Sequence, residues 1–254
     1  MVCKFHRGSA YKYPSEMSIH TEIDTTFDFR SDTPPGKDLD ALSPTLRKYH
    51  KLLWSNPLPS GARFDLVDNN PQAYLYHRSE IGEFFLSSDT VVPSFTRLTN
   101  IAHIINQIPK EELASFNTIG YTIGAMMVFP GNRIDRKMTI NGARGFHPRI
   151  KDRFDLTVEC IRRHYLNVGS PLGDTLRRSA NFFALFDSFR QYIEFFLLQD
   201  IVTEDFSAVR FFARFDIFET SPLPSSREAY ARYKQLAETF IEARNRRILM
   251  WAVR

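Results

Sequence analysis

The chain has 254 residues, of which 43% are hydrophobic and 24% are charged, and its formal net charge is +4. This composition excludes a mainly disordered protein, and the length favours one large domain over two. The small excess of positive charge favours anionic partners without requiring them. The 23 phenylalanines indicate a core or a groove that is built from aromatic rings.

Cysteine content and hydropathy restrict the location of the protein. Cys3 and Cys160 are far apart and form no CxxC pair, so the sequence predicts neither a disulfide framework nor a cysteine zinc site. The N-terminus has no apolar segment after its positive charges, and the longest apolar run, "YIEFFLLQDIV", is too short to cross a bilayer. We expect a cytoplasmic protein without a membrane anchor.

The first part of the chain mixes helix and strand signals. Residues 1–23 show no clear period and are predicted to be a tail or a docking segment, and residues 24–254 to form one globular domain. Ser43 and Pro44 are typical of a helix start and predict a helix over about 43–54. The aromatic and β-branched runs of residues 73–92 predict two or three strands.

The middle of the chain continues this mixture. Apolar residues at helical spacing predict a helix over 94–108, which Pro109 ends. Residues 118–131 read as a buried strand whose glycines let another backbone come close.

From Lys151 onward the pattern is helical. Acids at the start of this helix and arginines at its end suit the helix dipole, and Glu159 is placed to pair with Arg162 or Arg163. Residues 174–202 are apolar almost all round and predict a longer, central helix. Residues 208–218 alternate and leave strand or loop open, and residues 225–254 predict a final amphipathic helix with a serine cap. The fold class expected is α+β, a helix-rich single domain with a small mixed or antiparallel sheet.

Standard catalytic signatures are absent. The sequence contains no GxxxxGK[ST], GxGxxG, HExxH or GxSxG, which disfavours P-loop, dinucleotide-binding, zincin and α/β-hydrolase sites.

The best candidate site is the segment "TINGARG", residues 139–145. Asn141 and Arg144, flanked by glycines, could present a guanidinium and free amides to a phosphate or carboxylate. The amides at the start of the following helix would add to such a site, but Asp152 and Asp155 would repel the same anion. In the alternative interpretation, Arg144 ties its loop to a carboxylate.

Several other residues complete this hypothesis. Arg163 is a further ligand-binding candidate, and Asp155 or His164 could act as acid or base beside the arginines. Gln199 and Asp200, at the end of an apolar run, need partners if they are buried, and Arg144 or Arg163 would be natural ones.

Two weaker candidates lie elsewhere. His77 and Glu80, with later serines, are similar to the strand-borne His and Ser of ADP-ribosyltransferases, but the glutamate that this chemistry requires cannot be assigned. The cluster Asp32, Lys37, Asp38 and Asp40 could bind a divalent cation or form a solvated turn. No metal site is predicted, because no second histidine has a suitable spacing.

The segments "YTIGAMMVFPG", "TINGARG", "DRFDLTVECIRRHY" and "FFLLQDIV" resemble, in order and spacing, a broad family of uncharacterised bacterial proteins, a domain family of unknown function. The resemblance covers residues 24–245. It implies a bacterial or phage origin and brings no activity, cofactor or catalytic residue.

The leading hypothesis is an intracellular bacterial enzyme or binding domain that acts on a phosphate-bearing ligand, either a nucleotide or RNA. By analogy, an isolated bacterial domain of this kind suits phage defence or growth inhibition. The alternative is a non-enzymatic interaction module in which the phenylalanine-rich helices bind a protein partner. The sequence identifies no cofactor and no oligomeric state.

Overall fold

The computed structural model describes residues 22–68, 75–131 and 137–253. The predicted N-terminal segment 1–23 therefore lies, except for its last two residues, outside the described residues. The helices are α1 (Leu39–Leu42), α2 (Pro44–Trp54), α3 (Ala102–Ile105), α4 (Lys110–Ile119), α5 (Ile140–Phe146), α6 (Phe154–Tyr165), α7 (Gly173–Arg178), α8 (Ala180–Phe183), α9 (Phe189–Phe195) and α10 (Arg227–Ala252). The 3-10 turns are η1 (Phe29–Asp32), η2 (Thr99–Ile101), η3 (Ile123–Ala125) and η5 (Gln199–Ile201).

The strands form one antiparallel sheet in the order β1-β2-β3-β4. They are β1 (Val67–Asp68), β2 (Leu75–Ser79), β3 (Gly82–Thr90) and β4 (Met126–Pro130). The pairing of β2 with β3 ends at Leu75 and Leu86, whereas β4 pairs with β3 as far as Thr90. Among the described residues, no strand pairs with this edge of β3 beyond Leu86. The prediction of an α+β fold with a small antiparallel sheet is confirmed.

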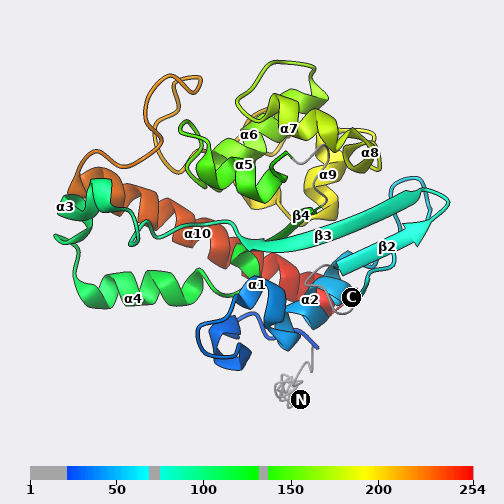
Figure 1. The fold of residues 1–254 in the computed structure, drawn as a ribbon, viewed down its shortest axis with the longest axis horizontal. Helices are drawn as coiled ribbons and strands as arrows, with labels where there is room; N and C mark the ends of the chain where they lie inside the picture. Colours follow the sequence, from blue (N-terminus) through cyan, green and yellow to red (C-terminus); the bar gives the residue numbers. More distant parts are fainter. Residues whose placement is uncertain (1–21, 69–74, 132–136, 254) are drawn as a thin grey trace, which may run out of the picture.

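The helices lie on both sides of this sheet. In Figure 1, α5 to α9 gather on one side of β3 and β4, and α1, α2 and α4 lie on the other. The long helix α10 contacts η3, α4 and η5, and so links these parts. Within the described part of the chain, no helix is long and apolar enough to cross a membrane.

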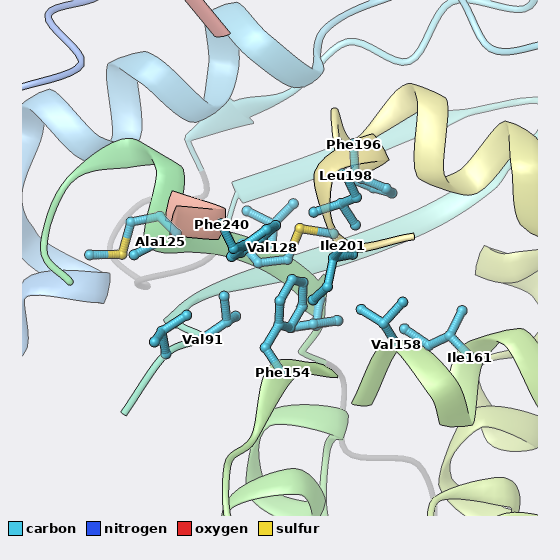
Figure 2. Packing of buried hydrophobic residues seen from close by; sticks show 14 of the residues in the cluster. Val91, Ala125, Val128, Phe154, Val158, Ile161, Phe196, Leu198, Ile201 and Phe240 are labelled. Atoms are coloured by element: carbon cyan, nitrogen blue, oxygen red, sulfur yellow. The ribbon is translucent and has the colours of Figure 1, made fainter. Parts of the chain in front are cut away.

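The core is shared by the sheet and the helices of both sides. Figure 2 shows Val128 of β4 packed near Phe154 and Val158 of α6 and Phe240 of α10. A second aromatic group surrounds Tyr192, whose ring lies 4.9 Å from that of Phe196, centroid to centroid. Most phenylalanines therefore pack in a core, as the composition indicated.

Several predicted elements are confirmed with their caps. Ser43 caps α2 by accepting a hydrogen bond from the Leu46 amide, with Pro44 at the first helical position. Ser226 caps α10 in the same way. Residues 73–92 contain β2 and β3. A Cβ on Gly124 would lie only 2.5 Å from the Ile241 carbonyl oxygen of α10, so the close backbone approach predicted for these glycines is present.

Other predictions were wrong. The long apolar helix over 174–202 is broken into α7, α8 and α9, because Ser188 starts a new helix by accepting from the Gln191 amide. The helix predicted over 94–108 is reduced to η2 and α3. For residues 208–218, where the sequence left strand or loop open, the structure has no strand beyond one bridge between Val202 and Val209. The supposed buried strand 118–131 is a strand only over β4.

Candidate functional site

The predicted anion-binding loop is a short helix, α5. Thr139 caps it by accepting a hydrogen bond from the Gly142 amide, and this helix turns Arg144 inward, where its side chain is fully buried. Arg144 pairs with Asp89 of β3 and lies 2.9 Å from Asp152. Its guanidinium also donates to the carbonyl oxygens of Val91 and Asp152, at 3.1 and 2.8 Å.

This geometry corresponds to the alternative interpretation, in which Arg144 ties its segment to carboxylates. A buried guanidinium with two carboxylate partners and two carbonyl partners has little capacity left for a ligand. Arg144 instead joins α5, the end of β3 and the turn before α6. It is a positioning residue.

Asn141 lies one turn before Arg144 and covers the open edge of β3. Its Nδ2 donates to Ser87 Oγ at 2.9 Å and to the Ser88 carbonyl oxygen at 3.2 Å. Its Oδ1 is buried and has no hydrogen-bond partner among the described residues. The same edge is closed from the other side by Asp40 of α1, which accepts from the backbone amide of Thr90.

The two carboxyls near this edge have unusual ionisation. Burial, together with the negative charges of Asp89 and Asp38, raises the pKa of Asp40 to about 8. Burial also raises the pKa of Asp89, although Arg144 opposes this shift and Asp152 adds to it. Carboxyls with raised pKa values cluster at functional sites more often than elsewhere, so this edge is of interest.

A histidine and a serine meet at the same place. His50 Nε2 lies 2.9 Å from Ser88 Oγ, and the Trp54 indole donates to His50 Nδ1 at 3.0 Å. Because an indole N–H only donates, Nδ1 must be unprotonated and Nε2 carries the proton of the neutral ring. Burial lowers the pKa of His50 to about 3. His50 therefore donates to Ser88 and does not act as a base that would activate it.

The remaining residues of the predicted site lie apart from it. Asp155 is fully buried, is paired with Arg153 and accepts the Phe212 amide at 2.8 Å. His164 lies against the Phe183 ring, and burial and Arg177 lower its pKa. None of these contacts joins Asp155 or His164 to the edge of β3.

Arg163 and Asp200 are each paired locally. Glu159 receives hydrogen bonds from both Arg162 and Arg163 at 2.8 Å, as the helical spacing predicted. Asp200 is paired with Arg247 of α10 at 2.8 Å. The expected pairing of Asp200 with Arg144 or Arg163 was wrong, because α10 covers η5.

The weaker candidates also have structural roles. His77 is buried against Phe64 and contacts the Asp65 carbonyl oxygen and Ser79 Oγ, whereas Glu80 is exposed in the β2–β3 turn.

The acids of residues 32–40 are divided among separate elements. Asp32 accepts from Ser43 and from the Thr45 amide, and Asp38 caps α1. In the described residues, no group of three or more His, Cys, Asp or Glu side chains is placed to hold a metal ion.

A pocket of about 620 Å³ opens beside the Arg144 cluster. Thr90, Gly145 and Asp152 belong both to its wall and to the segments that Arg144 joins. Its other lining residues come from four parts of the chain: Arg30, Pro93, Ser94, Phe95, Thr96, Arg97, Leu98, Asn117, Tyr121, Phe146 and Lys151.

The pocket has a cationic lining and an unusual backbone. Arg97 and Lys151 form no ion pair with any described residue, and Arg30 lies over the Tyr121 ring at 4.7 Å while paired with Asp28. Phe95, Lys151 and Asp152 have positive φ angles of 59°, 46° and 66°. Such conformations are unfavourable for a residue such as phenylalanine and are retained most often at functional sites.

The family model of DUF6994, a family of unknown function, matches residues 23–248. The chain belongs to this family. This match confirms the resemblance to a domain family of unknown function. No curated protein and no solved structure matches the chain, so DUF6994 membership brings no assigned activity, and the site must be argued from its geometry.

The sequence analysis did not find the residues of this pocket. Arg30, Arg97, Tyr121 and Lys151 are separated along the chain by up to about 120 positions and follow no common motif. The one local indication lay at Lys151 and Asp152. The helical pattern of the sequence begins at Lys151, whereas α6 begins three residues later, at Phe154. Lys151 and Asp152 have positive φ angles, which an α-helix does not accept, so the helix starts only after them.

Proposed function

We propose that the pocket beside Arg144 binds a phosphate-bearing ligand of the nucleotide type. The observation that carries the proposal is the combination, in one pocket, of cationic side chains without carboxylate partners and aromatic rings. The cations would hold the phosphate, and the rings would contact the base.

The cations converge from different elements. Arg97 comes from the turn before η2, Lys151 from the turn before α6, and Arg30 from η1. Arginine forks and lysine ammonium groups are the usual protein partners of phosphate. Because Arg97 and Lys151 lack carboxylate partners among the described residues, binding an anion breaks no ion pair of theirs.

The single acid of the pocket is already neutralised. Asp152 lines the wall, but its carboxylate lies 2.9 Å from Arg144. The buried positive charge of Arg144 reduces the repulsion that Asp152 would exert on a phosphate. In this proposal Arg144 shapes the site without touching the ligand.

The aromatic residues suit a planar base. Tyr121 is half-buried beneath Arg30, and Phe95, also in the lining, is buried. Rings and guanidinium planes both stack on nucleobases.

The alternative, an interaction module that uses its phenylalanines to bind a partner, has less support. Most phenylalanines contact one another in the core, as around Tyr192. Among the large apolar side chains that are exposed in the described residues, Phe146 is the one phenylalanine. The aromatic content is therefore accounted for by packing.

The proposal includes action in a bacterial cytoplasm. Cys160 is a free, buried thiol whose pKa burial raises to about 12, and an unreactive thiol of this kind suits a reducing compartment.

The experiment is isothermal titration calorimetry with adenosine monophosphate and uridine monophosphate, beside the nucleosides and inorganic phosphate. We expect the nucleotides to bind and Arg97→Ala and Lys151→Ala each to weaken binding at least fivefold. Arg232→Ala, an exposed arginine of α10 outside the pocket, is the matched control and should bind as wild type. Absence of nucleotide binding, or equal binding in all variants, would contradict the proposal.

A further inference from the structure

We infer that the ligand is a single-stranded nucleic acid that crosses the turn between α5 and α6, and that a mononucleotide fills only part of its binding surface. This inference rests on the proposed function and names the substrate class of the same site. It is carried by a second cationic pocket that residues of the same turn line, and by the exposed ring of Phe146, which lines the first pocket and directly precedes the residues of the second.

The second pocket has a volume of about 320 Å³. His147 and Arg149 of the turn line it together with Arg163 of α6, opposite a wall that consists of Gly169, Ser170, Pro171, Ile217 and Phe218. No carboxylate side chain belongs to this lining.

The two pockets share one short stretch of chain. Gly145, Phe146, Lys151 and Asp152 line the first pocket, whereas His147 and Arg149 line the second. The stretch is tightly folded, since the amides of Ile150 and Lys151 both donate to the His147 carbonyl oxygen. Neighbouring residues of one turn therefore point into both pockets, and an extended ligand can reach both.

The charges of the second pocket suit a phosphate backbone. The Arg149 guanidinium is exposed and forms no ion pair with any described residue. Arg163 remains partly accessible beside Glu159, with its guanidinium 5.1 Å from the centre of the Phe218 ring. Burial and Arg149 lower the pKa of His147, so the arginines supply the charge at neutral pH.

Phe146 lies at the junction. It is the last residue of α5, immediately before His147, and its side chain is 74% exposed. An exposed ring between cationic pockets is the arrangement by which proteins bind single strands, with bases stacked on aromatic side chains and phosphates held by arginine and lysine. A mononucleotide cannot occupy both pockets at once, whereas several linked nucleotides can.

The test is fluorescence anisotropy with a labelled uridine 12-mer and a labelled 2′-deoxyuridine 12-mer, beside calorimetry with uridine monophosphate. We expect the 12-mers to bind at least tenfold more tightly than the mononucleotide. Arg149→Ala, outside the first pocket, should weaken 12-mer binding about tenfold and leave mononucleotide binding unchanged. Phe146→Ala should also weaken 12-mer binding about tenfold. Arg149→Ala should also reduce the slope of log K against log salt by about 0.7.

The controls separate this inference from the proposed function. Phe146→Tyr should restore 12-mer binding, Arg232→Ala should have no effect, and all variants should keep the wild-type melting temperature because the replaced side chains are exposed. The inference is overturned if the 12-mer binds no more tightly than the mononucleotide, or if neither substitution changes the affinity for the 12-mer. The proposed function still holds in that case if mononucleotide binding depends on Arg97. Absence of all binding overturns both. A preference between the two 12-mers would identify the sugar that is recognised.

Discussion

At the scale of single residues, the charged side chains divide into buried, structural ones and accessible ones. Arg144 and Asp155 are fully buried, with carboxylate or guanidinium partners. Arg97 and Lys151 line the pocket and have no such partner in the described residues. Residue type and sequence position alone do not separate these two groups, but burial does.

Arg144→Ala should reveal the structural role of this arginine. Removing it leaves the partly buried carboxyl of Asp89 without its cation. It also leaves three further hydrogen-bond acceptors without their donor, which should lower the free energy of unfolding by about 3–5 kcal/mol in total. Urea denaturation followed by tryptophan fluorescence measures this loss. Arg97→Ala is the comparison and should change stability by less than about 0.5 kcal/mol. A loss below about 1 kcal/mol for Arg144→Ala would argue against the structural role.

Asp40→Asn should change how stability depends on pH. The pKa of Asp40 is about 8 in the folded protein and lies near 3.8 when the group is unperturbed, so the folded state retains a proton that the unfolded state loses. The stability that this proton provides is complete below about pH 4 and is lost as pH rises towards 8.

The amide of an asparagine at position 40 carries no charge at any pH. As pH rises from 5 to 8, the free energy of unfolding of the variant should therefore increase by about 2 kcal/mol or more relative to that of wild type. Melting curves of both proteins across this range give the difference. The comparison cancels other titrations, such as that of His50, which are common to both proteins. If the stabilities of the two proteins change in parallel with pH, Asp40 is ionised in the folded wild type across this range.

At the scale of elements, η3 and α10 make a close backbone contact. The Gly124 amide donates to Asn245 Oδ1 at 2.7 Å, and α10 lies directly against this glycine. Arg244, also on α10 and fully buried, donates to the carbonyl oxygens of Gly124, Met126 and Phe196. One turn of α10 therefore holds both β4 and the end of α9.

Gly124→Ala should be destabilising, because its Cβ would lie 2.5 Å from a backbone oxygen that cannot move without shifting α10. We expect a loss of about 1–3 kcal/mol in the free energy of unfolding. Gly169→Ala is the matched control, since a Cβ there meets no atom within 4 Å. Equal stability of the two variants in urea would contradict the close packing of α10 on η3.

At the scale of the whole molecule, α10 connects the helices on both sides of the sheet. Its contacts reach η3, α3, α4 and η5, and α3 and η5 lie more than 90 residues apart along the chain. A helix of 26 residues that packs along several elements makes separate unfolding of either side unfavourable.

The chain should therefore unfold in one cooperative transition. Tryptophan fluorescence reports on Trp54 of α2 and Trp251 of α10, and far-ultraviolet circular dichroism reports on all helices. We expect the two urea transitions to coincide, as the two-state criterion requires. Separate midpoints would instead indicate two independently folding parts within residues 24–254.

The sequence by itself determined the features that depend on near neighbours. The caps at Ser43 and Ser226, the paired strands of residues 73–92 and the pairing of Glu159 with the arginines one turn later all follow from spacings of a few residues. The aromatic core followed from composition, and the family of unknown function followed from the order of several segments.

Only the tertiary structure decided the features that depend on distant contacts. The inward direction of Arg144 follows from the carboxylate of Asp89 on β3, 55 positions away, and the pocket forms because Arg30, Arg97 and Lys151 are brought together from three separate turns. The apolar stretch 174–202 folds as three short helices because its rings pack around Tyr192 instead of along one axis. Local propensity is a weak preference, and packing between segments distant in sequence overrides it.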